Sequence, residues 1–88
     1  MTKKEYLFDR LERQANISVY KYVKKNYVSA AAYFHSAAEL GIVLEDCFKI
    51  QPGDSKYFIN IMRKCCDYWG VNYNSYFDKM CEYAYEEG

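Results

Sequence analysis

Few side chains in this sequence could carry out covalent chemistry, and the first candidates are His35 and the adjacent Ser36. Neighbouring residues on a helix point about 100° apart, so the two are not preformed as a histidine-activated hydroxyl. The chain also lacks a nucleophile elbow, a phosphate-binding glycine loop and a dinucleotide-binding glycine motif. We therefore predict that the protein is not an enzyme, with no catalytic residue, no cofactor and no small-molecule substrate. His35 is expected at the surface or its boundary.

Thiols are the second source of chemistry, at Cys47, Cys65, Cys66 and Cys81. No two of them have the spacing of a zinc ribbon or knuckle, and we expect no metal site, the alternative being a mixed site with His35. Without a secretory signal the thiols should stay reduced. Cys47, Cys65 and Cys81 fall on apolar helix faces, where a free cysteine acts as a small hydrophobic residue.

Charge could support binding, although 12 basic and 12 acidic residues give the 88-residue chain a net charge of zero. Residues 1–25 hold seven basic and three acidic side chains, and residues 26–88 hold five and nine, so the two parts carry +4 and −4. The basic part could contact phosphate, the acidic part could meet a basic protein, or both could simply be solvated. The candidate contacts to phosphate or to an acidic partner are Lys21, Lys24, Lys25, Arg10 and Arg13.

Tyrosine is unusually frequent, with 11 residues beside five Phe and one Trp. A core this small cannot enclose all of these rings, so several tyrosines must be at least partly exposed. Tyr combines a large apolar surface with a polar tip and is enriched at interfaces. The tyrosines therefore indicate a binding surface, or else they replace Leu at half-buried positions. Base stacking is a further use, which the surrounding acids disfavour.

Helices must position these side chains, because only one Pro and four Gly interrupt the chain. Thr2 and Glu5 have the spacing of a capping box, which predicts a first helix with an apolar stripe as far as Ala15. Asn16 is predicted to break that helix or to cap the next one. The second helix then extends to Tyr27, with a strand at 17–22 as the weaker alternative.

The middle of the chain predicts a third helix, capped by Ser29 and ended by Gly41, the residue that most easily adopts a positive φ. One or two helical turns follow from Leu44. The sequence Gln-Pro-Gly at 51–53 then predicts a turn.

Two further helices complete the prediction. Asp54 or Ser55 caps a helix that ends at Gly70, and its apolar stripe includes Trp69. Asn74 caps the last one. We therefore expect an all-α fold, a compact bundle of five or six short helices in a single domain spanning 1–88. Its basic N-terminal helices span 1–27 and its acidic part spans 29–87.

Several patterns between residues 32 and 77 resemble a known helical family. A helix that contains Ala37 is predicted to end at Leu40-Gly41-Ile42. A second predicted helix end, Trp69-Gly70-Val71, follows 29 residues after the first glycine. Cys47 and Ile50 occupy the two inward positions of the short helix between them. This register is similar to that of the Cro/CI-type, or XRE-like, helix-turn-helix family.

The resemblance implies a Cro/CI-like helix-turn-helix core that binds duplex DNA through the short helix. The exposed positions that would contact DNA or another partner are Leu44, Glu45, Asp46, Phe48 and Lys49. The sequence departs from the family at functional positions, because Ala32 and Tyr33 replace the usual Thr-Gln and Val43 replaces a Ser or Thr cap. Adjacent acids at 45 and 46 would also repel phosphate, and basic or amide side chains are the usual major-groove readers.

These observations predict a small non-enzymatic macromolecule-binding protein of the cytoplasm. The leading hypothesis is a DNA-binding transcriptional regulator of helix-turn-helix type, as a possible homodimer on a palindromic site. The alternative is a protein-binding inhibitor encoded by a phage or mobile element, of the anti-CRISPR or anti-defence type. Its acidic, tyrosine-rich surface would bind a basic host protein such as a nuclease. No apolar run is long enough to span a membrane.

Overall fold

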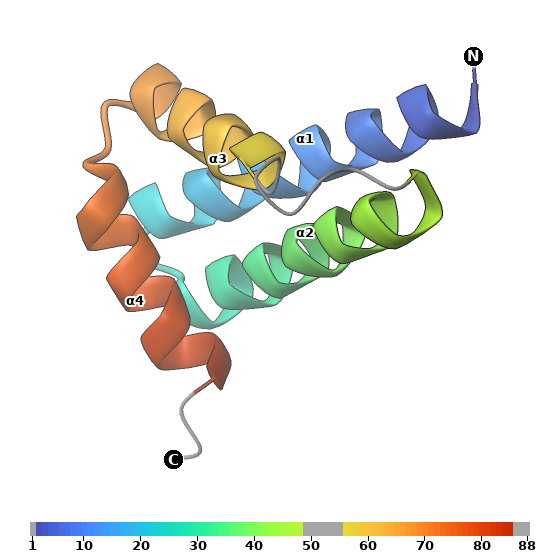
Figure 1. Cartoon of the computed structure of the whole chain (residues 1–88). Helices are drawn as coiled ribbons and strands as arrows, with labels where there is room; N and C mark the ends of the chain where they lie inside the picture. Colours follow the sequence, from blue (N-terminus) through green and yellow to red (C-terminus); the bar gives the residue numbers. More distant parts are fainter. Residues whose placement is uncertain (1, 49–55, 86–88) are drawn as a thin grey trace.

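The computed structural model describes residues 2–48 and 56–85, and these residues form four α-helices. They are α1 (Lys3–Val23), α2 (Tyr27–Phe48), α3 (Lys56–Trp69) and α4 (Tyr73–Tyr85). Helices α1 and α2 run antiparallel side by side, α3 packs on α1, and α4 packs on α2 (Figure 1). The predicted all-α class is confirmed. The predicted bundle of five or six short helices with a helix-turn-helix core is wrong, because two of the four helices found here are long and unbroken.

Helix α1 begins as predicted, since the Thr2 side chain accepts a hydrogen bond from the Glu5 backbone N–H at 3.1 Å. It continues through Asn16, where a break was expected. It ends where Lys25 adopts a positive φ of 64° and the Asn26 N–H donates to the Lys21 carbonyl at 2.9 Å. This arrangement is a Schellman motif, normally marked by glycine. Because no glycine marks this stop, the sequence pattern extended the helix to Tyr27, beyond its end at Val23.

Helix α2 is capped by Asn26 rather than Ser29, because the Ser29 N–H donates to the Asn26 side chain at 3.4 Å. It passes through Gly41 without interruption, so the turn that a helix-turn-helix core requires is not formed there. A β-carbon at Gly41 would lie 3.5 Å from the Cβ of Phe58 and 3.9 Å from Leu11. Gly41 therefore lies inside α2, at a point where this helix comes close to α1 and α3.

The boundary between α3 and α4 is close to the predicted one. Gly70 ends α3 with a φ of 70°, and the Val71 N–H donates to the Cys66 carbonyl at 2.8 Å. Asn72 caps α4 by accepting from the Ser75 N–H at 3.0 Å, two residues before the predicted Asn74. The predicted turn at 51–53 and the predicted caps at 54 and 55 lie outside the described residues.

The core is built around Phe34 of α2. Its ring makes edge-on contacts with Phe58 of α3 and with Tyr76 and Phe77 of α4, at centroid distances of 5.7, 6.0 and 5.8 Å. Small side chains line the contact between α1 and α2, which lets the two helix axes approach. The buried apolar residues are Leu11, Ala15, Val19, Ala30, Ala31, Phe34, Ala37, Leu44, Met62, Cys65, Cys66, Tyr76 and Met80.

One buried polar group joins three helices. Ser18 of α1 is fully buried, donates to the Ala30 carbonyl of α2 at 2.6 Å, and lies 2.6 Å from the hydroxyl of Tyr76 on α4. Since the serine proton goes to the carbonyl, the tyrosine hydroxyl donates to the serine. Burial also raises the pKa of Tyr76 far above its ordinary value of 10.0. This satisfied polar contact fixes how α4 sits on the α1–α2 pair.

Candidate binding surface

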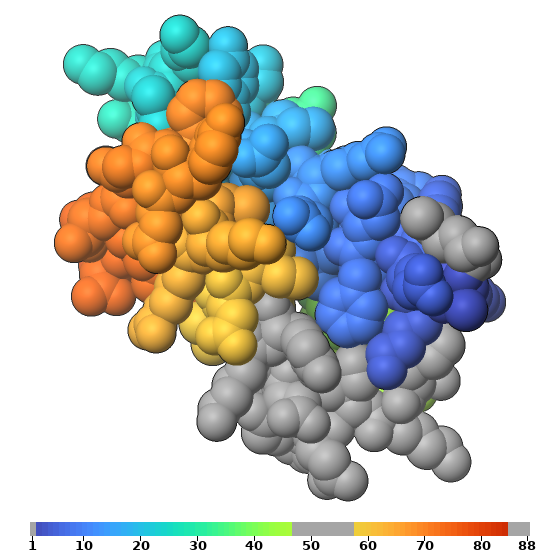
Figure 2. All heavy atoms as spheres, turned by 90° about the horizontal axis from the view of Figure 1, so that it is seen from above, coloured from blue at the N-terminus to red at the C-terminus, as the bar shows by residue number. Residues whose placement is uncertain are grey.

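Helices α1 and α3 form one continuous face of the molecule, seen as the blue and gold atoms in Figure 2. A groove of about 440 Å³ runs between them. We call this the α1/α3 groove, and its lining residues are Asp9, Glu12, Arg13, Asn16, Lys64, Cys65, Tyr68 and Trp69.

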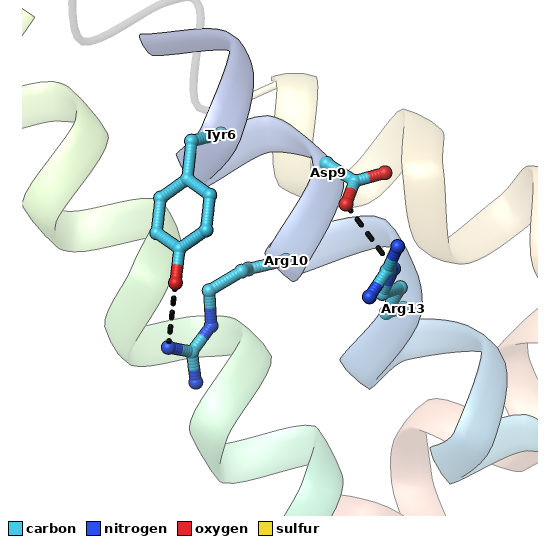
Figure 3. Close-up of polar contacts among 4 residues, drawn as sticks. All are labelled: Tyr6, Asp9, Arg10 and Arg13. Carbon is cyan, nitrogen blue, oxygen red and sulfur yellow. Dashed lines mark hydrogen bonds and ion pairs between the residues drawn. The ribbon is translucent and has the colours of Figure 1, made fainter. Parts of the chain in front are cut away.

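The α1 wall of the groove carries charged and polar residues because positions three and four apart share one helix face. Arg13 Nε lies 3.1 Å from an Asp9 carboxylate oxygen (Figure 3). Across the groove, Lys64 Nζ lies 4.0 Å from a carboxylate oxygen of Glu12. All four side chains are well exposed, so each pair stabilises the fold by only about 0–1 kcal/mol. Such weak pairs can exchange for contacts with a binding partner at little cost.

The α3 wall is aromatic. Trp69 is half-buried, and its indole Nε1 donates to the Asn16 side-chain oxygen at 2.9 Å. The centre of its ring lies 5.3 Å from the centre of the Tyr20 ring and 5.3 Å from the centre of the Tyr68 ring. Tyr68 is 79% exposed, the highest value among the large apolar and aromatic residues of the described chain. Tyr20, Trp69 and Tyr68 therefore form a row of contacting rings, which we call the ledge, and Tyr68 is its exposed end.

Basic residues flank this ledge at the end of α1. Lys24 Nζ lies 5.6 Å from the centre of the Tyr20 ring, within the range of a cation–π contact. Lys24 and Lys25 are exposed and Lys21 is half-buried. The α1/α3 groove thus passes from paired charges to the rings of Tyr68 and Trp69, and Tyr20 and the lysines lie beyond this aromatic end.

Folding redistributes the charge that the sequence order suggested. Residues 3–25 carry seven basic and three acidic side chains, and α3 adds three basic and one acidic, so this layer has a net charge of +6. Helix α2 has three acids and no Lys or Arg, and α4 has two acids and one Lys, which gives −4. The basic and acidic parts are therefore two layers of helices rather than two halves of the chain.

The five predicted basic contacts do not form one site. Arg13 lines the groove, and Lys21, Lys24 and Lys25 lie beyond its aromatic end. Arg10 points elsewhere, toward Tyr6 and α2 (Figure 3). Its guanidinium donates to the Tyr6 hydroxyl at 3.4 Å and lies 6.0 Å from the centre of that ring.

The five predicted recognition positions are not presented as a short exposed helix. Leu44, expected to be exposed, is only 2% exposed because it packs into the core at the end of α2. Glu45 is half-buried and Asp46 is exposed. The Phe48 side chain and Lys49 lie outside the described part of the chain. The burial of Leu44 follows from the continuity of α2 through Gly41.

Asn16, Tyr68 and Trp69 were not predicted as site residues. Asn16 was interpreted as a helix boundary and Trp69 as a core residue on an apolar stripe. The available signal was the adjacency of Tyr68 and Trp69, since neighbours on a helix cannot both face the core. The pairing of Trp69 with Asn16 across 53 positions could not be inferred from local pattern.

Burial of the two thiols near the groove disfavours their reactive thiolate form. Burial raises the pKa of Cys66 to about 12, and burial together with the charge of Glu12 raises the pKa of Cys65 above its ordinary 9.0. His35 is exposed and lies 2.8 Å from Glu39. In the part of the chain that the structure describes, no three His, Cys, Asp or Glu residues could hold a metal ion, and no helix has the length and apolar character to cross a membrane.

Comparison with family models, with curated proteins and with solved structures gave no match. The resemblance to Cro/CI-type proteins therefore stays a prediction based on spacing. Function has to be argued from the geometry of the surfaces described above.

Proposed function

We propose that the protein is a non-enzymatic protein-binding module and that the α1/α3 groove is its interface. The observation that carries the proposal is the ledge of Tyr20, Trp69 and Tyr68, which is held by Asn16 and ends in a ring that is 79% exposed. Trp, Tyr and Arg are the residues that most often dominate the free energy of protein association. All three types meet here around one groove.

The charges of the α1/α3 groove favour a protein partner over duplex DNA. Asp9 and Glu12 line the groove with their carboxylates, which would repel a phosphate backbone. A protein can instead supply residues of both signs to replace the exposed pairs at Arg13 and Lys64. Because the layer as a whole is positive, we expect the partner to present an acidic surface, which would also speed its association.

This proposal keeps part of the functional hypotheses drawn from the sequence. A small domain with no catalytic role would act by occupying a surface of its partner, as the inhibitor hypothesis requires. The regulator hypothesis depended on a short helix starting at Leu44, which is part of α2 and buried at that residue. The described residues therefore favour the α1/α3 groove as the place of contact.

Co-purification with matched variants tests the proposal. The tagged protein, Tyr68→Ala and Lys64→Glu would be expressed in the source cells, with Tyr6→Ala as the control because Tyr6 is 48% exposed outside the groove. We expect one stoichiometric protein partner to be retained by wild type and by the control, and to be lost from both groove variants. A partner retained equally by all four proteins would overturn the assignment.

A second measurement addresses nucleic acid. Trp69 is the only tryptophan of the chain, so its fluorescence reports occupancy of the groove. We expect no saturable change on adding duplex DNA at about 0.15 M salt. A saturable change whose affinity falls steeply between about 50 and 200 mM salt would show that the groove binds nucleic acid instead.

A further inference from the structure

Helix α2 carries exposed apolar side chains on its outer face in addition to the apolar face that packs into the core. Its inner side contributes Ala30, Phe34, Ala37 and Leu44 to the core. Its outer side also carries large apolar residues, with Val28 72% exposed, Ile42 57% exposed and Val43 41% exposed. A surface helix normally has one apolar stripe and one polar face. The exposed apolar residues on the outer face of α2 have no cover among the described residues.

The outer residues of α2 fall on one line. Six exposed positions follow one another at spacings of four and three residues, which keeps them on a single face of the helix. Val28 and Ala32 lie at one end of the line, a 2.8 Å contact between His35 and Glu39 occupies its centre, and Ile42 followed by Asp46 lies at the other end. We call this line the α2 outer stripe, and its members are Val28, Ala32, His35, Glu39, Ile42 and Asp46.

The N-terminal end of the stripe opens into an apolar depression. A hollow of about 300 Å³ lies between α2 and α4, beside Val28 and Ala32, and Tyr83 of α4 forms its far side. Tyr83 is 45% exposed. A side chain the size of Leu or Phe from a partner could bury apolar surface there, which is the main source of association free energy.

The charge around the α2 outer stripe indicates what kind of partner it would bind. Helix α2 has three acidic residues and no Lys or Arg along its 22 residues. The one lysine of α4, Lys79, is already engaged, because its Nζ lies 3.9 Å from Glu82 and within 6.0 Å of the centres of the Tyr27 and Tyr83 rings. Glu39 contacts His35, and Asp46 is exposed. Since Lys79 is the one Lys or Arg of α2 and α4, the surface around the stripe is acidic and favours a partner that brings positive charge.

We propose that the α2 outer stripe is a second docking surface, which takes a basic amphipathic helix of a partner protein. The 3–4 spacing matches the apolar stripe of such a helix, as in helix-in-groove recognition. A second copy of this chain fits less well, because α2 has three acids and no Lys or Arg, so two copies would bring two acidic helices together. This inference does not depend on the α1/α3 groove, and either surface can fail alone.

Selection from a display library of helical peptides with random charge and apolar spacing tests the inference. Wild-type protein would be the target, and the double variant Glu39→Lys/Asp46→Lys would be used for counter-selection. We expect the recovered peptides to combine Lys or Arg with apolar residues at 3–4 spacing. Their affinity should fall about tenfold or more for the double variant and stay unchanged for Asp78→Lys, an exposed acid of α4 outside the stripe.

Three results would overturn the inference. Recovered peptides could be acidic, or they could bind the double variant as tightly as wild type. Alternatively, sedimentation could show a wild-type dimer that Ile42→Asp dissociates, which would identify a second copy of the chain as the occupant. Circular dichroism and urea unfolding of each variant check that the fold is retained, and the single variant Ile42→Asp provides a second, charge-independent probe of the stripe.

Discussion

The indole N–H of Trp69 donates to the side-chain oxygen of Asn16 at 2.9 Å and so joins the middle of α1 to the end of α3. The two residues are 53 positions apart in the sequence. The contact orients the half-buried indole in the α1/α3 groove, beside the rings of Tyr20 and Tyr68. The proposed interface therefore depends on a hydrogen bond that is itself at the surface.

Replacing Asn16 tests this contact. Asn16→Ala removes the acceptor, but the freed indole N–H can reach water, so the free energy of unfolding should fall by only about 0.5–1.5 kcal/mol. The emission maximum of Trp69 should move to longer wavelength as the ring gains water. The exposed Asn74 serves as the control, and Asn74→Ala should leave the emission unchanged. An unchanged emission in Asn16→Ala would contradict the described contact.

The buried pair of Ser18 and Tyr76 gives a second prediction. Ser18→Ala leaves the buried tyrosine hydroxyl without its acceptor, which should cost about 1–3 kcal/mol of stability. Tyr76→Phe leaves Ser18 still bonded to the Ala30 carbonyl and should cost about 0.5–1.5 kcal/mol. In a double-mutant cycle by urea unfolding, the double variant should lose less than the sum of the single losses. Strict additivity would show that the two hydroxyls do not interact.

Glycine substitutions distinguish an unbroken α2 from a helix-turn-helix. Gly41→Ala should raise the free energy of unfolding by about 0.5–1 kcal/mol, because alanine is the better helix former and its Cβ would make only an ordinary contact with Phe58. Gly70→Ala is the matched control and should destabilise by about 1 kcal/mol, since Gly70 has a φ of 70°. A clear destabilisation by Gly41→Ala would indicate a turn at that position.

The buried thiols predict a loss of stability in alkali. Cys66 has an ordinary pKa of 9.0 in the unfolded chain and a pKa of about 12 in the folded protein, so above pH 9 the unfolded state releases its proton first. Its contribution to stability is present below pH 9 and is lost as the pH rises toward 12. Urea unfolding across this interval should show the fall, and Cys66→Ala should make it shallower. An equally steep fall in Cys66→Ala would assign the effect to other groups.

The sequence predicted helices where local chemistry marks them and failed where packing decides. The cap at Thr2 and the stop at Gly70 were found because a side-chain oxygen and a positive φ leave a signature in residue type. Gly41 and Asn16 are also residue types that often mark helix ends, but both lie inside long helices. Gly41 lies close to Phe58 of α3, and Asn16 accepts a hydrogen bond from Trp69, so tertiary contacts account for these two residues. The stop at Lys25 carries no such signature, because a lysine occupies the left-handed position.

The candidate site was less predictable than the fold. Arg13, Lys24 and Lys25 were identified from the basic N-terminal segment, but the basic residues of α3 belong to the part of the chain that counting assigned as acidic. Lys64 and Trp69 join the α1 residues only through packing of α3 on α1. The net charge of consecutive segments therefore could not reveal the basic layer, because this layer is formed by α1 and α3, which are separated in the sequence by α2.

Site-specific photo-crosslinking tests the central claim most directly. A photo-activatable amino acid in place of Tyr68 would sit at the exposed end of the ledge, and one in place of the exposed Asp78 on α4 is the control. In the source cells we predict one protein adduct from position 68, absent from position 78 and absent when Lys64→Glu is added. Adducts with nucleic acid, or the same protein adduct from both positions, would contradict the account.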